Sequence, residues 1–214
     1  DVQAASIDPE NLAEFDAREI EQNYAQIALE DPVAQIIALF NSSARPVILA
    51  GNGIRLAGAQ TDFLRLVELL GAPVLTTRLG VDLIPATHRL CYSMPGAIAS
   101  RGANFTLQNA DWLLILGARL DMALIAYAPD KLARAAKKIM VNIDPAEIMK
   151  LNNIIDIPVP ADAGLFIREF LKQSERLERR DRSAWLARCR EWQIKYPFVL
   201  PEHRAVKTGI SMYA

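Results

Sequence analysis

The sequence is poor in the residues on which several classes of protein depend. Its 214 residues include only two cysteines, Cys91 and Cys189, which lie far apart and without the spacing of a zinc site or a redox motif. We therefore expect two reduced structural thiols, as in cytoplasmic proteins, and neither a disulfide scaffold nor a metal site. Only two histidines are present, His88 and His203, and their polar, proline-containing surroundings favour loop positions over a catalytic base.

An excess of charge of one sign is missing as well. The 24 Lys and Arg residues nearly balance the 25 Asp and Glu residues, which leaves a formal net charge of −1 and no electrostatic footprint for nucleic acid. Arginines cluster only at 176–182, where acidic residues alternate with them, and this pattern predicts a solvent-exposed helix face. The longest apolar runs, such as 112–116, have the length of a strand, so we expect no contact with a membrane. The polar first residues do not resemble a signal peptide, which favours a cytoplasmic location.

The residues that are present favour one globular domain with a sizeable core, because 51% of them are hydrophobic and 23% are charged. Short apolar runs, typical of buried parallel strands, alternate with segments of helical periodicity. The expected strands are residues 46–51, 73–77, 90–92, 112–117, 138–143 and 156–159. The expected helices are residues 31–40, 63–70, 101–108, 129–136, 162–171 and 185–196.

Several helix ends carry recognisable signals. Asp31 stands at a suitable N-cap position before Pro32, Gly71 stops the second helix, and Asp162 is placed to cap the helix that follows the last strand. The alternation of strands and helices predicts an α/β fold, a doubly wound Rossmann-like domain with helices on both faces of the sheet. We expect about six parallel strands in the order 3-2-1-4-5-6.

In a sheet of this order, ligands bind where the strand order reverses, at the carboxyl ends of the first and fourth strands. Both strands end in glycine, Gly51 and Gly117, and polar residues such as Arg119 follow. Glycine lets the backbone approach a diphosphate closely, and an arginine fork binds phosphate oxygens, so the pattern is typical of a nucleotide site. Glycine at a strand end is just as often a simple turn residue, and the pattern alone leaves both interpretations open.

The dinucleotide fingerprint itself is absent. Residues 51–58 read G-x-G-x(4)-G instead of G-x-G-x-x-G, and the second strand ends in Thr76 and Thr77, where an NAD site would place an acidic residue. An ordinary NAD dehydrogenase is therefore disfavoured, and no Walker loop or nucleophile motif is present. The polar group at 101–104 fits helix capping about as well as ligand contact.

Five segments, in their order and spacing, resemble the central domain of thiamine-diphosphate-dependent enzymes, and in particular that of the acetolactate synthase large subunits. The segments are residues 45–53 (RPVILAGNG), 72–77 (APVLTT), 101–104 (RGAN), 109–121 (NADWLLILGARLD) and 137–148 (KKIMVNIDPAEI). The match extends over about residues 1–175.

The resemblance implies that the chain, which begins at Asp1 without a methionine, is cut from a longer protein. Residues 1–30 would be a linker from a missing pyrimidine-binding domain, residues 31–175 the central domain, and residues 176–214 a helical linker towards a missing pyrophosphate-binding domain. The parent enzyme would be a homodimer or homotetramer whose flanking domains are the partners of this one.

The resemblance also implies the chemistry of the parent enzyme. It would decarboxylate a 2-oxo acid such as pyruvate and transfer the two-carbon unit, with thiamine diphosphate and magnesium bound between the two missing domains. The Gly-Asp-Gly motif that holds the metal in this family does not occur here, so the fragment alone would have no catalytic residue and no metal ligand.

In acetolactate synthases the central domain binds FAD, and in some relatives it binds ADP or nothing. Carried over position by position, the contacts would fall on Gly51, Asn52, Gly53, Thr77, Arg78, Leu79, Met94, Pro95, Gly117, Ala118, Arg119, Asp121, Ile143, Asp144, Asp162 and Ala163. Two alternatives stay open. One is a stand-alone Rossmann-type domain that uses a nucleotide catalytically, and the other is a structural domain whose cleft is empty and which joins its neighbours.

Overall fold

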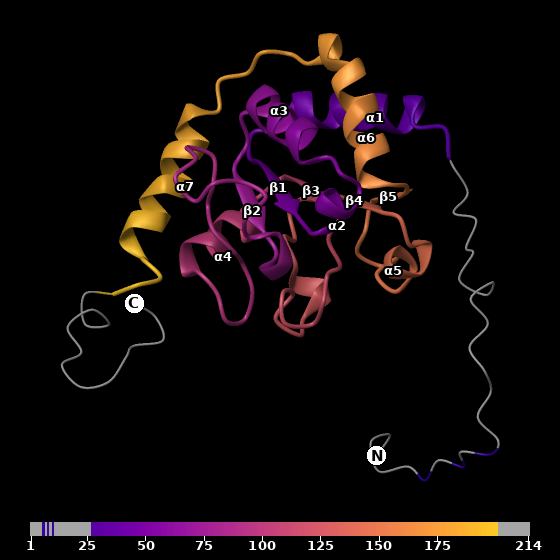
Figure 1. The fold of residues 1–214 in the computed structure, drawn as a ribbon. Helices are drawn as coiled ribbons and strands as arrows, with labels where there is room; N and C mark the ends of the chain where they lie inside the picture. Colours follow the sequence, from indigo (N-terminus) through magenta and orange to yellow (C-terminus); the bar gives the residue numbers. More distant parts are fainter. Residues whose placement is uncertain (1–5, 7, 9, 11–26, 201–214) are drawn as a thin grey trace.

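The computed structural model describes residues 6, 8, 10 and 27–200, so His203 and most of the predicted first linker lie outside the described residues. The described residues form one sheet of five parallel strands in the order β2-β1-β3-β4-β5 (Figure 1). The strands are β1 (Pro46–Ala50), β2 (Val74–Thr76), β3 (Trp112–Leu116), β4 (Lys137–Asn142) and β5 (Ile157–Pro160).

Seven α-helices are described: α1 (Glu30–Ser42), α2 (Gly53–Leu56), α3 (Gln60–Leu70), α4 (Arg101–Gln108), α5 (Pro145–Met149), α6 (Ala163–Lys172) and α7 (Ser183–Lys195). Three 3-10 turns accompany them: η4 (Arg78–Gly80), η5 (Pro129–Lys131) and η6 (Ser174–Arg176). The predicted α/β class and the doubly wound strand order are confirmed.

The predicted third strand at 90–92 is reduced to a single parallel bridge between Val74 and Cys91 at the edge of the sheet. Two hydrogen bonds hold it, from the N–H of Val74 to the carbonyl oxygen of Leu90 at 2.8 Å and from the N–H of Tyr92 to that of Val74 at 2.9 Å. The N–H of Thr76 also donates to the carbonyl oxygen of Ser93 at 3.2 Å, but Ser93 has a φ of 70° that does not fit a strand, and the regular pairing ends there.

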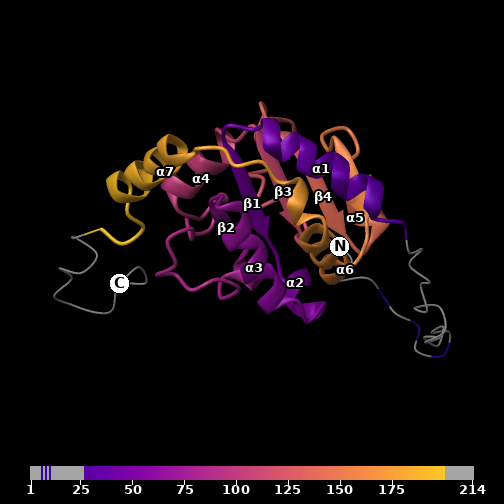
Figure 2. The same cartoon turned by 90° about the horizontal axis from the view of Figure 1, so that it is seen from above.

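Alternate residues of the strands enter two separate cores, one on each face of the sheet. On one face, Ile48 of β1 and Leu114 of β3 pack against α1, α3 and α6. On the other face, Leu49 and Leu113 lie with residues of α4 and α7. Figure 1 shows α1, α3 and α6 above the sheet and α4 below it, and Figure 2 shows the same layers from above. The sheet is therefore buried on both sides, which explains the unbroken apolar runs of its strands.

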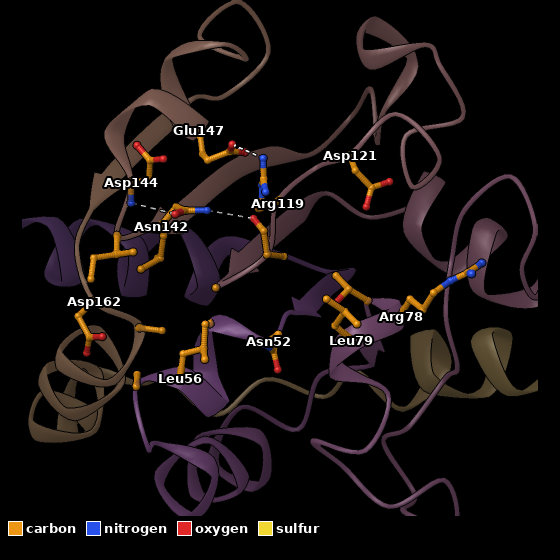
Figure 3. A pocket seen from close by; sticks show the side chains of 18 residues that line it. Asn52, Leu56, Arg78, Leu79, Arg119, Asp121, Asn142, Asp144, Glu147 and Asp162 are labelled. Atoms are coloured by element: carbon orange, nitrogen blue, oxygen red, sulfur yellow. Dashed lines mark hydrogen bonds and ion pairs between the residues drawn. The ribbon is translucent and has the colours of Figure 1, made fainter. Parts of the chain in front are cut away.

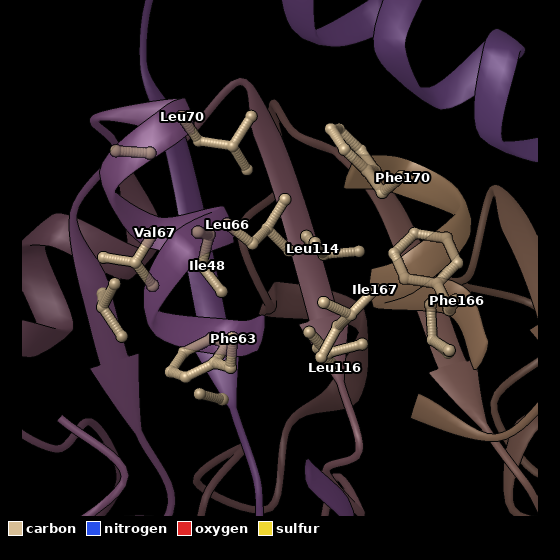
Figure 4. Close-up of a cluster of buried hydrophobic side chains, with 14 of the residues drawn as sticks. Ile48, Phe63, Leu66, Val67, Leu70, Leu114, Leu116, Phe166, Ile167 and Phe170 are labelled. Atoms are coloured by element: carbon tan, nitrogen blue, oxygen red, sulfur yellow. The ribbon is translucent and has the colours of Figure 1, made fainter. Parts of the chain in front are cut away.

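The helical periodicity of α3 and α6 gives the first core its aromatic and aliphatic contacts (Figure 4). Phe63 and Leu66 of α3 are fully buried, as are Phe166 and Phe170 of α6, whose rings lie 5.9 Å apart. Gly71 ends α3 with a left-handed φ of 58°, as the sequence predicts.

Two predicted helix details are wrong. Asp31 does not cap α1, because the helix already begins at Glu30 and its N-cap residue is Leu29. The helix expected at 129–136 is only the short turn η5, since Leu132 is extended and Ala133 has a φ of 38°, which breaks any helix at that point.

The arginine-rich stretch is also not a helix face. Past η6 the chain runs without regular structure to Arg182, and its arginines bind the carboxyl end of α1. Arg180 donates to the carbonyl oxygen of Ser42 at 2.6 Å, and Arg182 donates to that of Phe40 at 2.7 Å. The last carbonyls of a helix lack partners within the helix, so these guanidinium groups supply donors that charge alternation did not predict.

The stripe predicted on the last helix is buried as expected at Trp185 and Cys189 of α7, which packs against α4. Helix α7 also covers the edge of the sheet. Arg190 donates to the carbonyl oxygen of Arg89 at 2.8 Å and Gln193 to that of Cys91 at 3.4 Å, so side chains occupy two acceptors that another strand would otherwise bind.

Candidate functional site

A cavity of about 730 Å³ opens at the carboxyl ends of the strands, where the order reverses between β1 and β3 (Figure 3). Its volume falls in the range of about 300–1,000 Å³ that is usual for small-molecule sites. Its walls come from segments after all five strands, including Asn52 after β1, Thr77 after β2, Arg119 after β3, Asp144 after β4 and Asp162 after β5.

Thirteen of the sixteen predicted site residues line this one cavity: Asn52, Gly53, Thr77, Arg78, Leu79, Gly117, Ala118, Arg119, Asp121, Ile143, Asp144, Asp162 and Ala163. Their convergence follows from the fold, because all of them stand at or just beyond strand ends. The lining residues that sequence reasoning missed are Leu56, Ala57, Val141, Asn142 and Glu147.

Gly51, Met94 and Pro95 do not line the cavity. The loop that carries Met94 and Pro95 is held against α4 instead, since the side chain of Asn104 bonds both the N–H and the carbonyl oxygen of Gly96, at 2.8 and 2.9 Å. Within residues 101–104, Asn104 thus holds this loop, while the cap of α4 is supplied by Ser100 just before them, whose side chain accepts from the N–H of Ala103.

Gly51 is required by packing. A Cβ atom placed on it would lie 2.3 Å from the carbonyl oxygen of Gly117, and one placed on Gly53 would lie 2.7 Å from the Cα atom of Gly117. The loops after β1 and β3 therefore touch each other at backbone distance. The N–H of Gly53 donates to the carbonyl oxygen of Gly117 at 2.9 Å, so this N–H is not free to bind a phosphate.

Other donors remain at the cavity. Within the described residues, the backbone N–H groups of Ala118 and Arg119 have no acceptor. The side chain of Asn52 is oriented by Arg55, whose guanidinium donates to its Oδ1 atom and to the carbonyl oxygen of Leu79 at 3.0 Å. The amide nitrogen of Asn52, a residue that lines the cavity, has no acceptor among the described residues.

The aspartates of the cavity each support the backbone around it. Asp144 accepts from the N–H of Ala146 at 2.8 Å and so caps α5, and Asp162 accepts from the N–H groups of Gly164 and Leu165 at 2.9 and 3.0 Å and so caps α6. Each uses its Oδ1 atom for this purpose, and the Oδ2 atoms have no partner among the described residues. A carboxylate held in this way can still accept a hydrogen bond from a ligand hydroxyl group.

Arg119 is engaged across the cavity mouth by Glu147, with 2.7 Å between its Nη2 atom and Oε1 (Figure 3). Burial raises the pKa of the Glu147 carboxyl, but hydrogen bonds from Lys150 and Arg119 outweigh it and hold the pKa below its usual range. The bond to Glu147 in turn raises the pKa of Arg119. Arg119 is therefore a cation at the rim of the cavity that is paired with Glu147, while 73% of its side chain stays exposed.

Asn142 and Glu147 were missed because their roles depend on neighbours in space. The Oδ1 atom of Asn142 accepts from the N–H of Asp144 at 3.0 Å, while its Nδ2 atom donates to the carbonyl oxygen of Ala118 at 3.4 Å and thus joins β4 to the loop after β3. Glu147 lies on the five-residue helix α5. It belongs to segment 137–148, which resembles the family, and this was the one sequence signal that could have pointed to Glu147. Arg78 lines the cavity with its stem, and its guanidinium extends away from Arg119 (Figure 3).

His88 lies far from the cavity, on the surface beside α3. Its Nε2 atom lies 2.7 Å from Oε1 of Glu68, and its Nδ1 atom accepts from the N–H of Leu90 at 3.2 Å. The two ring nitrogens are thus used to anchor the loop before the edge bridge, in agreement with the loop position that the sequence predicts.

Among the described residues, no helix is both long and apolar enough to cross a bilayer, and no three metal-ligating side chains gather at one point. Both cysteines are free and buried, as the sequence predicts.

The fold and the cavity define a doubly wound α/β domain of Rossmann-like architecture with a ligand-sized pocket at its topological switch point. Residues 33–170 match the family described as thiamine pyrophosphate enzyme, central domain, and the chain belongs to this family.

Individual relatives agree with this assignment. The chain is 38% identical over 149 residues to a probable acetolactate synthase large subunit of Methanococcus aeolicus. These residues make up 70% of this chain and 24% of the relative. It is 38% identical over 157 residues to a probable acetolactate synthase large subunit of Methanocaldococcus jannaschii, and these residues make up 72% of this chain and 26% of the relative. It is 31% identical over 171 residues to the acetolactate synthase large subunit of Lactococcus lactis, and these residues make up 80% of this chain and 29% of the relative. The chain thus spans about a quarter of the length of these relatives.

Proposed function

We propose that the chain is the non-catalytic central domain of a thiamine-diphosphate-dependent, acetolactate-synthase-like enzyme, and that its cavity binds the ADP part of FAD, or ADP itself. The parent enzyme decarboxylates a 2-oxo acid such as pyruvate and transfers the two-carbon unit to an acceptor. Thiamine diphosphate supplies the chemistry of that reaction when bound, together with magnesium, in the flanking domains. No described residue of this chain takes part in the step.

The observation that carries the nucleotide proposal is the convergence of thirteen residues, predicted from the resemblance, on one cavity at the switch point. Their chemistry also fits a nucleoside diphosphate. Arg119 and the unpaired N–H groups of Ala118 and Arg119 suit phosphate oxygens, and the free carboxylate oxygens of Asp144 and Asp162 suit ribose hydroxyl groups.

A second function is favoured by one specific observation. Gly51, Gly53 and Gly117 are explained by the contact between two loops, and the aspartates by helix capping, so none of them needs a ligand to account for it. The cavity would then be empty in the parent enzyme, and the domain would serve to join its neighbours.

Thermal unfolding with FAD, ADP and NAD separates the two functions. A ligand present at 100 times its Kd raises the free energy of unfolding by about 2.7 kcal/mol through mass action. We expect a saturable rise in Tm with FAD or ADP, and a rise with NAD as well would show that the ADP part common to all three is enough for binding. A chain that shows no rise with any nucleotide would leave the structural function.

The variant Arg119→Ala tests the proposed contact. Loss of a charge-assisted hydrogen bond costs about 1.5–3 kcal/mol, so the Kd for the nucleotide should rise at least about ten-fold. Arg65→Ala is the matched control, because Arg65 is a similarly exposed arginine on α3 that pairs with Asp62 away from the cavity. Equal affinity in the Arg119→Ala and Arg65→Ala chains would show that the site is misplaced.

A further inference from the structure

A second cavity, of about 370 Å³, lies at the opposite end of the sheet from the first. It opens beside the amino ends of β4 and β5, and we refer to it as the amino-end cavity. The segment before β4 contributes Arg134, the start of β4 contributes Lys137 and Lys138, the segment before β5 contributes Asn153 and Asp156, and η5 contributes Asp130.

Lys138 is the unusual residue of this cavity, because only 8% of it is exposed. Its Nζ atom donates to the carbonyl oxygen of Ala136 at 3.2 Å, and no described carboxylate lies within 4.0 Å of it. An ammonium group has three N–H donors, and lysine is rarely buried to this degree without an anionic partner. Removal from water costs a charged group several kcal/mol, which an anion beside it would offset.

The carboxylate of Asp156, which lines the same cavity, is already committed. Asp156 accepts from Nζ of Lys137 at 2.9 Å through Oδ1 and from the backbone N–H of Lys138 at 2.9 Å through Oδ2. Burial raises the pKa of Asp156, but these donors hold it below its usual range, so the group is ionised and neutralised by Lys137. The charge of Lys138 also helps to lower the pKa of Asp156, but among the described residues no carboxylate lies within ion-pair distance of its ammonium group.

Two further donors surround the cavity. Arg134 lies at the exposed tip of a turn closed by a 2.8 Å hydrogen bond from the N–H of Ala136 to the carbonyl oxygen of Ala133. Neither the guanidinium of Arg134 nor the amide of Asn153 has a partner among the described residues. One carboxylate, on the exposed Asp130, opposes them, which leaves the unpaired groups of the cavity with one positive charge in excess.

We propose that the amino-end cavity binds a small oxyanion, a phosphate or carboxylate group, between the ammonium of Lys138 and the guanidinium of Arg134. The anion supplies the acceptor atoms that Lys138 lacks, and the arginine fork matches two oxygens of either group. The site is separate from the nucleotide cavity, which lies at the other end of the same strands.

The test is titration of the 214-residue chain with inorganic phosphate, with acetate and with chloride at matched ionic strength. Saturable binding of phosphate or acetate, with shifts in the backbone amide NMR signals of residues 134–138, is the expected result. Phosphate alone would identify a phosphate group as the ligand, acetate alone a carboxylate. Shifts confined to the loops after β1 and β3 would place the anion in the first cavity and overturn the proposal.

Lys138→Met keeps a flexible, unbranched side chain that is one atom shorter, and removes its charge. We expect the Kd for the anion to rise about ten-fold or more, equivalent to 1.4 kcal/mol. Lys131→Met is the matched control, since Lys131 lies on η5 and does not line the cavity. Equal affinity in the two variants would overturn the proposal.

If Lys138→Met does not fold, Arg134→Gln tests the same site, because it changes only an exposed side chain. A loss of affinity in that variant supports the site, and wild-type affinity contradicts it.

Discussion

The N–H of Gly53 donates to the carbonyl oxygen of Gly117 at 2.9 Å, and the two residues approach so closely that neither has room for a side chain. A Cβ atom on Gly117 would lie 2.9 Å from the Cα atom of Gly53. Gly117 also has a φ of 59°, which side chains disfavour. The contact joins the β1 and β3 loops at the point where the strand order reverses, and both residues line the switch-point cavity.

Gly117→Ala should therefore destabilise the chain through both backbone strain and overlap. Left-handed backbone costs about 1–2 kcal/mol and overpacking about 1–3 kcal/mol, so we expect the free energy of unfolding to fall by roughly 2–5 kcal/mol. Gly58→Ala is the control, because Gly58 has a similar φ of 63° but open space around it. Urea unfolding of both variants would measure the difference, and equal losses would show that the contact carries no energy of its own.

Asp162 separates a structural role from a binding role. Asp162→Ala removes the acceptor of two N–H groups at the start of α6 and should cost about 0.5–2 kcal/mol in stability. Asp162→Asn retains an acceptor oxygen and should unfold close to wild type. If a nucleotide hydroxyl binds the free oxygen, Asp162→Asn should still weaken nucleotide affinity several-fold, measured by calorimetry. Wild-type affinity in this variant would leave Asp162 with the capping role alone.

The features that the sequence predicts correctly are the local ones. The apolar runs of β1 and β3 and the stop at Gly71 depend on residues close together in the chain, so periodicity and turn chemistry are enough to find them. The switch-point cavity also follows, because parallel strands bring their carboxyl ends to one edge. The resemblance added individual residues such as Arg119 to that edge.

The features that were missed depend on contacts between distant segments. The strand expected at 90–92 is a local exception, because the φ of 70° at the adjacent Ser93 does not fit a strand. The role of Glu147 comes from Arg119, which lies 28 positions earlier. The arginines around Arg182 have the composition of an exposed helix, and only the position of α1 shows that its carbonyls bind them.

Arg182 gives a direct test of this last contact. Its guanidinium donates to the carbonyl oxygen of Phe40 and lies 4.2 Å from the centre of the Phe40 ring. Burial lowers the pKa of Arg182, and the charge of Arg180 lowers it further. The cost of keeping this group charged therefore offsets part of the stability that its contacts with Phe40 supply. We expect Arg182→Ala to lower the free energy of unfolding by about 1–2 kcal/mol, measured by thermal unfolding.

Arg180→Ala is the comparison for Arg182→Ala, because Arg180 is exposed and lies over no ring. Its loss should be roughly 0.5 kcal/mol or less. Arg182→Lys should recover only part of the wild-type stability, since an ammonium group cannot both stack on Phe40 and reach its carbonyl as a planar fork does. Full recovery by lysine would show that charge alone explains the contact.

Cys189 of α7 predicts a dependence on alkaline pH. The residue is fully buried, and burial raises the pKa of its thiol to about 12, while the nearby hydroxyl of Thr106 lowers it slightly. An unfolded thiol has a pKa of about 8.5. As pH rises above that value, the unfolded chain loses this proton first, so the contribution of Cys189 to stability is complete below about pH 8 and declines between about pH 9 and 12.

Alkylation by iodoacetamide at pH 9 measures this burial, in a Cys91→Ala background so that only Cys189 reports. The thiolate is the reactive form, and at pH 9 a thiol of pKa about 12 is ionised to roughly one part in a thousand. We expect native Cys189 to react about a thousand-fold more slowly than the same chain in urea. A native rate within ten-fold of the unfolded rate would mean that α7 leaves α4 frequently, and would contradict the packing that covers the edge of the sheet.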